Sequence, residues 1–122
     1  MDLENLILKV KSTPGFSDNV GMVLIHNGVV RGKSKDGKKV LGLKVSYDHS
    51  KIKQIIEHHE KKDGIFKILI EVREGYFHPG EDLMYIVVAG DVRENVKSVL
   101  SDVLEEVKSN AVTKQEITGD KS

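Results

Sequence analysis

The sequence predicts an α+β fold in which helices alternate with pairs of strands. Three segments repeat apolar residues at helical spacing, and four others have the length and apolar content of strands. The predicted order is α-β-β-α-β-β-α, so the helices are segregated between β pairs. This order favours α+β over a doubly wound parallel sheet, and the chain contains no internal repeat or low-complexity segment.

Each of the three predicted helices has one apolar face. Asp2 is the expected N-cap of the first helix, Asp48 or Ser50 caps the second, and the last is capped near Asp91. A Pro-Gly pair ends the first helix and an Asp-Gly pair ends the second. The apolar faces comprise Leu3, Leu6, Ile7 and Val10, then Ile52, Ile55, Ile56 and His59, and finally Val92, Val96, Val99, Leu100, Val103, Leu104 and Val107.

Four strands are predicted, at residues 20–25, 40–47, 65–72 and 83–89. The first and last are near-continuous apolar runs, which are typical of interior strands, and the other two alternate. Asn27-Gly28 after the first run fits either a hairpin turn or a bulge within one long strand, and the pattern leaves both open. The expected core faces comprise Leu41, Leu43, Val45 and Tyr47 on one alternating strand and Phe66, Ile68, Ile70 and Val72 on the other.

The composition excludes several classes of protein. The charges balance, with 19 Lys and Arg against 19 Asp and Glu, which argues against a nucleic-acid-coating role. The absence of Cys excludes disulfides and thiolate sites and favours a reducing compartment. No apolar run approaches the ~18 residues that cross a bilayer, and the acidic start has no cationic n-region. We therefore expect a cytoplasmic protein without a membrane partner, with one domain over residues 1–117 and a flexible tail at 118–122.

Common catalytic and metal-binding motifs are missing. The five His include the adjacent pair His58-His59, whose side chains diverge on a helix, and they include no His-x3-His pair. No Ser lies in a Gly-x-Ser-x-Gly elbow, and the glycines form neither a phosphate-binding loop nor a dinucleotide fingerprint. We therefore expect no metal, no cofactor and no hydrolase triad.

The most informative residues are cations at the ends of predicted elements, where a scaffold presents the residues of a site. They are Arg31 after the first strand, Arg93 at the start of the last helix, Lys108 at its end, and Lys114 in a polar segment that also holds Glu116. A cation such as Arg93 opposes the dipole at a helix N-terminus unless a negative group is near. Either an anionic ligand or an acidic neighbour such as Glu94 resolves that conflict, and the sequence leaves both open.

A strongly basic loop follows the first strand. Residues 31–39 hold five basic side chains and one acidic side chain, within a chain whose formal net charge is zero. Such a cluster is either a flexible solubilising loop or a source of positive field for an anionic substrate and an acidic partner surface.

Four short motifs occur in a specific order along the chain. They are Gly28-Val29-Val30-Arg31, Arg73-Glu74-Gly75 with Pro79-Gly80-Glu81, Val92-Arg93, and Lys108 with Lys114-Gln115-Glu116. Over residues 20–116 the chain thereby resembles the large, catalytic subunit of molybdopterin synthase. That family has Gly-x-Val-Arg, Arg-x-Gly-x-Leu-x-x-Gly-Glu, His-Arg, and a Lys followed by Trp-Lys-x-Glu, at closely similar spacings.

The resemblance implies a cytoplasmic sulfurtransferase of molybdenum or tungsten cofactor synthesis. Such an enzyme converts cyclic pyranopterin monophosphate to the dithiolene of molybdopterin, with sulfur from a small ubiquitin-like carrier that ends in a Gly-Gly thiocarboxylate. The implied assembly is a homodimer of large subunits with one carrier at each end, a heterotetramer. The implied fold is a hammerhead-like α/β sandwich with an antiparallel or mixed sheet and a long C-terminal amphipathic helix.

The resemblance also assigns roles residue by residue. Lys108 and Lys114 match the family's two catalytic lysines, and Arg31 and Arg93 match its anion-binding arginines. Glu116 matches the acid after the second lysine, and it either positions Lys114 or is a surface acid. A lysine beside other cations is pushed toward its neutral amine, which suits proton transfer during sulfur insertion. The arginines suit a cyclic phosphate and a carrier's terminal carboxylate.

Three positions depart from the family pattern. Val92 stands in place of His, Thr113 in place of Trp, and His26 near a usual Phe. A missing imidazole can be replaced by His26 or His78 if the fold brings either one close. The alternative function is a non-catalytic paralogue that acts as a carrier- or pterin-binding adaptor.

Overall fold

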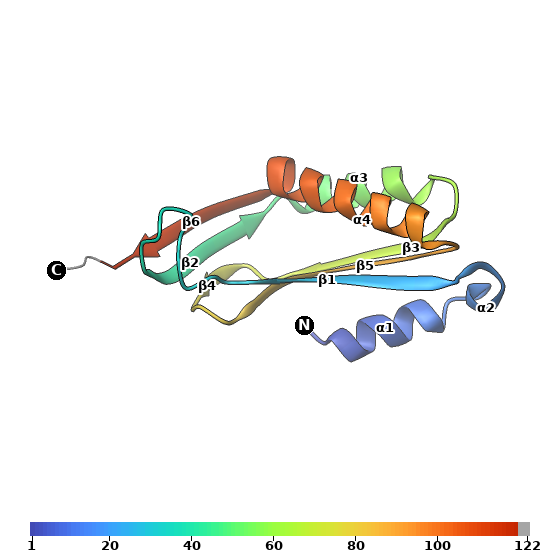
Figure 1. Ribbon diagram of the computed structural model, residues 1–122, viewed down its shortest axis with the longest axis horizontal. Coiled ribbons are helices and arrows are strands. Elements are labelled where there is room, and N and C mark those ends of the chain that lie inside the picture. The colour runs from blue at the N-terminus through green and yellow to red at the C-terminus, as the bar shows by residue number, and fades with distance from the viewer. Residues whose placement is uncertain (120–122) are drawn as a thin grey trace.

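The computed structural model describes residues 1–119 and has two layers of helices around a β structure (Figure 1). In chain order the elements are α1 (Leu3–Lys11), α2 (Phe16–Asn19), β1 (Met22–Val29), β2 (Val40–Tyr47), α3 (His49–Glu60), β3 (Ile65–Val72), β4 (Gly75–Phe77), β5 (Asp82–Gly90), α4 (Arg93–Glu106), the π-helix η1 (Val107–Ala111) and β6 (Val112–Thr118). No helix of the described part of the chain is both long and apolar enough to cross a membrane.

The strands form two antiparallel sheets, which confirms the α+β prediction. The first sheet has the order β1-β5-β3 and the second has the order β4-β2-β6. Helices α3 and α4 lie together on one side of the first sheet, and α1 lies on the other side (Figure 1).

The core lies on both faces of β5, the central strand of the first sheet. Residues 83–90 are all buried, as expected for an interior strand. On one face, Met84, Ile86 and Val88 join a cluster with α3 and α4 that continues into the second sheet through Leu43 and Val45. On the other face, Tyr85, Val87 and Ala89 pack against α1. The second sheet is thus attached to the first through one shared apolar cluster.

Several local predictions are confirmed. The strands at residues 40–47 and 65–72 have the predicted bounds. Asp2 caps α1, and Asp48 rather than Ser50 caps α3, because its carboxylate accepts the Lys51 N–H at 3.1 Å. At Asn27-Gly28 the chain continues as one strand, with a register shift between Gly28 and Val29, so the bulge interpretation is correct.

Two residues of the predicted core faces were assigned wrongly, in both cases because of a local irregularity in strand pairing. Leu41 is 44% exposed and Val40 is buried, since the pairing of β2 with β6 shifts register between Val40 and Gly42. Phe66 packs toward α1 instead of the α3/α4 side, and the pairing of β3 with β5 shifts register between Ile65 and Lys67. Such a shift reverses the side on which the following residues point.

Two strands of the second sheet were missed. β4 lies between the predicted strands at residues 65–72 and 83–89, and β6 lies after the last predicted helix, so neither was among the four strands expected. The long helix is therefore followed by another regular element. Thr118, which the sequence assigns to the tail, pairs with Val40, and residues 120–122 of that tail lie outside the described residues.

Candidate functional site

A cavity of about 570 Å³ lies where the two sheets and η1 meet. Its apolar wall includes Val30, Leu43, Leu83, Met84 and Val107, which are all buried. Its polar side chains come from two stretches far apart in the sequence, residues 26–47 and 108–116, and they include His26, Arg31, Lys35, Tyr47, Lys108, Lys114 and Glu116. Four of the five predicted site residues therefore line one cavity, and the exception is Arg93.

Arg31 is placed by the end of the first strand. The neighbouring Val30 is 4% exposed, its N–H donates to the Glu81 carbonyl at 2.9 Å, and its carbonyl accepts the Gly80 N–H at 2.9 Å. These bonds fix the backbone where the chain leaves the first sheet. Arg31 follows at the cavity wall, with the apolar core directly behind it.

Lys108 is the second residue of the π-helix η1. Its neighbour Val107 is fully buried and Ala111 is 2% exposed, so one side of η1 is anchored in the core. The Ala111 carbonyl also accepts the N–H of Asp48, the N-cap of α3, at 2.8 Å. A π-helix has a wider turn than an α-helix and occurs often at functional sites. Here it ends α4 and presents Lys108 to the cavity.

Lys114 and Glu116 are presented by β6. Lys114 pairs with Val45 and Glu116 pairs with Leu43, both of which are buried residues of β2. Residues paired across an antiparallel sheet share a face, so these two charged side chains lie on the core side of the second sheet. Thr113 and Gln115 alternate to the exposed side and do not line the cavity.

The cavity environment favours the neutral amine of Lys114. Burial lowers its pKa, and the positive charge of Lys108 lowers it further, with smaller contributions from Arg31 and Lys35. Glu116 acts in the opposite direction and raises the pKa of Lys114. The result is a lysine whose ammonium is partly desolvated and lies near a second lysine, which is an environment suited to proton transfer.

Two further polar side chains face the cavity. Burial lowers the pKa of His26, and the charge of Lys108 lowers it further, so its imidazole is held toward the neutral form. Burial and the Glu74 carboxylate raise the pKa of Tyr47 to about 12, so its phenol is a hydrogen-bond donor near neutral pH. Tyr47 was predicted only as a core-face residue, because its place beside β6 depends on a strand that the sequence pattern does not indicate.

The basic loop forms an ordered hairpin beside the cavity. Lys33 and Lys39 form a β-bridge, the Ser34 N–H donates to the Lys38 carbonyl at 2.9 Å, and the Ser34 hydroxyl accepts the Lys38 N–H at 3.1 Å. Gly37 has a positive φ of 84°, which closes the turn. Lys35 in this hairpin lines the cavity, so the loop adds positive charge to the site.

Arg93 lies at the other end of α4 from Lys108. This helix is 14 residues long, so Arg93 lies about 21 Å from η1 along the helix axis. Asp91, whose carboxylate accepts the Val92 N–H at 2.6 Å, supplies negative charge at this helix end. Bonds from Asn95 and from the Val92 N–H lower the pKa of Asp91. The chain's own acid therefore complements the helix dipole there.

The family's His is replaced by Val92, and of the two histidines that could supply the missing imidazole only His26 lines the cavity. Val92 is 49% exposed beside Arg93, and His78 lies next to Glu81 with Nδ1 and Oε2 3.5 Å apart, away from the cavity lining. His26 lines the cavity, so it is the imidazole that this chain brings to the site. Among the described residues no three His, Cys, Asp or Glu side chains group closely enough to hold a metal ion.

Comparisons with known proteins agree with this arrangement. A family model described as the MoaE protein matches residues 1–110. A probable molybdopterin synthase of Haloferax volcanii is 30% identical over 124 residues, in an alignment that covers 97% of this chain and 47% of that protein. The chain thus spans about half the length of this curated relative.

Solved structures share the fold. The molybdopterin synthase structure from Staphylococcus aureus has a TM-score of 0.72 and 23% identity, and the match covers 84% of this chain and 77% of that one. A complex of subunits 1 and 2 of molybdopterin-converting factor from Helicobacter pylori matches with a TM-score of 0.71 and 23% identity, over 99% of this chain and 82% of that one. Molybdopterin cofactor biosynthesis protein E from Burkholderia multivorans has a TM-score of 0.76 and 17% identity, over 100% of this chain and 87% of that one.

Proposed function

Because the chain belongs to the MoaE family, we propose that it is the catalytic subunit of a molybdopterin synthase. It inserts sulfur from a thiocarboxylated carrier protein into cyclic pyranopterin monophosphate and so makes the molybdopterin dithiolene. The observation that carries this proposal is the single cavity that brings Arg31 together with Lys108, Lys114 and Glu116, which lie far from it in the sequence.

The cavity has the chemistry that sulfur insertion needs. Lys114, with its lowered pKa, exchanges a proton with the reacting groups as sulfur is transferred and the carrier's carboxylate is released. Lys108 lies beside it and supplies positive charge where negative charge gathers. Arg31 offers a guanidinium for bidentate binding of the cyclic phosphate or the terminal carboxylate.

The size and charge of the cavity suit these two partners. Its volume of about 570 Å³ falls in the range of roughly 300–1,000 Å³ that small-molecule sites occupy. The hairpin at residues 33–39 adds positive field for an anionic pterin and for an acidic carrier surface. The Helicobacter pylori relative was solved as a complex of two subunits, which supports a small protein partner for this chain as well.

A role for Arg93 in the same anion site requires a second copy of the chain. Within one copy, Arg93 is at the far end of α4 and outside the cavity lining. We therefore place Arg93 in the site only through a homodimer, as the resemblance implies. The cytoplasm is the compartment we assign to this assembly, since the chain has no Cys that an oxidising compartment would pair.

The proposal is tested by a single-turnover assay with a thiocarboxylated carrier and cyclic pyranopterin monophosphate, in which the dithiolene product is oxidised to a fluorescent pterin. Lys114→Ala is expected to lower the rate by about 10²–10⁴-fold, the range for loss of a positioned acid or base, and Lys108→Ala to lower it strongly as well. Lys44→Ala is the matched control, because Lys44 is exposed on the opposite face of β2.

If the folded wild-type protein binds the carrier without forming product, this result contradicts the proposed catalytic function and supports the adaptor alternative. Full activity in both Lys108→Ala and Lys114→Ala contradicts the assignment of the site. The adaptor is not favoured at present, because the cavity retains both lysines and Arg31.

A further inference from the structure

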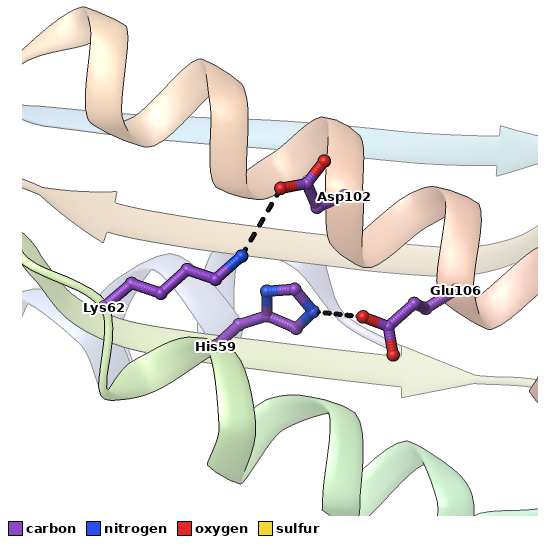
Figure 2. A network of polar contacts seen from close by, with 4 residues as sticks. All are labelled: His59, Lys62, Asp102 and Glu106. Atoms are coloured by element: carbon purple, nitrogen blue, oxygen red, sulfur yellow. Dashed lines mark hydrogen bonds and ion pairs between the residues drawn. The ribbon is translucent and has the colours of Figure 1, made fainter.

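A buried histidine joins the two helices that cover the first sheet. His59, near the end of α3, is 1% exposed, and its Nε2 lies 2.6 Å from Oε1 of Glu106, the last residue of α4 (Figure 2). Glu106 is 41% exposed at its side chain, so the bond runs from the core to the protein surface. Lys62, in the turn after α3, and Asp102 of α4 form a second, more exposed contact nearby.

The His59 contact is not explained by stability alone. A carboxylate accepts a hydrogen bond, so Nε2 of His59 donates to Glu106. The other ring nitrogen, Nδ1, is then buried and has no hydrogen-bond partner among residues 1–119. An apolar side chain fills such a place without leaving a polar atom unsatisfied, so a buried polar group with an orphaned atom calls for another reason.

The position of Glu106 supplies that reason. Glu106 directly precedes η1, and Lys108 is only two residues further along the chain. The other end of η1 is also held by α3, because the N–H of Asp48 donates to the Ala111 carbonyl at 2.8 Å. Helix α3 therefore contacts the π-helix segment at both of its ends.

We propose that His59 is a positioning residue that sets the location of Lys108 in the cavity through its hydrogen bond to Glu106. The bond fixes the last turn of α4 and with it the start of the π-helix. Without it, the segment is free to rewind toward an α-helix, which turns Lys108 about the helix axis relative to the cavity. The role of Lys108 in sulfur transfer rests on the proposed function, whereas its position does not.

The competing explanation is that apolar packing alone positions Lys108. Val107 and Ala111 are buried on the same segment and anchor it in the core. The two explanations predict different positions of Lys108 when the hydrogen bond is removed and the packing is kept. His59→Leu makes that change, and His59→Gln keeps an N–H donor near the place of Nε2.

The first readout is the pKa of His26, measured by NMR titration. The charge of Lys108 contributes to the lowered pKa of His26, so this imidazole reports the distance to Lys108 without any substrate. Lys108→Ala gives the full rise to be expected when the charge is lost. We expect His59→Leu to show a large part of that rise and His59→Gln to return the pKa toward the wild-type value.

The second readout is turnover, and Lys62→Gln is the matched control for both. A small misplacement of a catalytic group costs up to about 10²-fold in rate, so kcat is expected to fall by about 10–100-fold in His59→Leu and to recover in His59→Gln. Lys62→Gln breaks the neighbouring contact between Nζ of Lys62, in the turn after α3, and Oδ2 of Asp102, which are 3.3 Å apart, and is expected to leave both readouts unchanged.

Glu106→Ala removes the same hydrogen bond by changing its more exposed partner. This variant tests the positioning role of His59 if His59→Leu does not fold. Loss of this negative charge by itself lowers the pKa of His26, so a rise in that variant reports movement of Lys108. A His26 pKa that is no higher than wild type in every folded variant lacking the bond contradicts the proposal and assigns the positioning to Val107 and Ala111. If the wild-type protein has no turnover, the proposed function is wrong, and the His26 titration still decides the role of His59.

Discussion

The two sheets have opposite roles in this molecule. The first sheet is covered on both faces, and residues 83–90 of its central strand β5 are all buried. The second sheet is covered on one face only, and its outer face exposes Leu41 at 44% and Tyr76 at 45%. Its inner face carries Lys114 and Glu116 beside the cavity. The first sheet thus supplies the apolar core, and the second supplies the charged groups.

This division explains how charged groups lie against the core. Lys114 is paired with the buried Val45, so its ammonium loses part of its hydration, and this loss is the main reason for its lowered pKa. Such a position is unfavourable for stability unless the surrounding structure is firm enough to hold it. The apolar cluster that runs from β5 into β2 gives that support.

The largest effect is expected from a cavity in the first sheet. Ile86 is fully buried at the centre of β5 and does not line the site. Ile86→Ala is expected to lower the free energy of unfolding by about 2–5 kcal/mol, because it removes buried methyl groups and leaves a void. Urea denaturation measures this loss, while KM and kcat per folded molecule stay at wild-type values.

Leu43→Ala in the second sheet is the matched comparison. Leu43 is 5% exposed and belongs to the same apolar cluster, but it also lines the cavity. This variant is expected to change the kinetic constants as well as the stability. Equal kinetic effects in the two variants contradict the division between a stabilising sheet and a functional sheet.

An intermediate effect is expected from the hairpin that adjoins the second sheet. Lys35 lines the cavity and contributes to the lowered pKa of Lys114, so it acts through its positive charge. If the proposed function is right, Lys35→Ala is expected to raise KM for the anionic pterin by about 2–5-fold with little change in kcat, and the effect shrinks as salt is added. Lys38→Ala, in the same hairpin but outside the cavity lining, is the control. An effect of Lys35→Ala that does not respond to salt contradicts the electrostatic explanation.

The sequence predicts the first sheet better than the second, and the reason lies in the same division. The strand at residues 83–89 is evident because a doubly covered strand is apolar throughout. The strand at residues 112–118 escapes prediction because its inward-facing Lys114 and Glu116 are polar, which removes the alternation that marks a strand. A local pattern therefore fails where a charged site replaces the core. The bulges near Leu41 and Phe66 also depend on cross-strand pairing, which one segment does not encode.

The residues of the candidate site were chosen by resemblance more than by pattern. Spacing alone shows that Arg31, Lys108 and Lys114 stand at the ends of elements, and only the matched motifs group them. The cavity contains all three. His26 and Tyr47 join it through the pairing of β1 with β5 and of β2 with β6, contacts between distant segments that no single-sequence signal contains. The hydrogen bond between His59 and Glu106 joins residues 47 positions apart, so it could not be predicted from the sequence for the same reason.

The smallest effect is a pH-dependent stability difference at Lys114. Its pKa is lowered in the folded protein from the ordinary value of 10.5, so the ammonium form is disfavoured by folding. Below the folded pKa both states are protonated, and the folded state bears the full penalty. Between the folded pKa and 10.5 the unfolded chain binds more protons, so the stability of the wild-type protein rises with pH through this window.

Lys114→Met removes the ammonium and keeps an unbranched side chain, so it isolates this penalty. The variant is expected to have a higher urea midpoint than wild type at pH 7, and the two midpoints converge as the pH approaches 10.5. The difference is small, because the Lys114 side chain keeps much of its exposure to solvent and Glu116 offsets part of the penalty. Lys44→Met, on the exposed face of β2, corrects for the loss of one positive charge. A variant less stable than wild type at pH 7 means that the second sheet gains stability from Lys114, which contradicts the contrast between the two sheets.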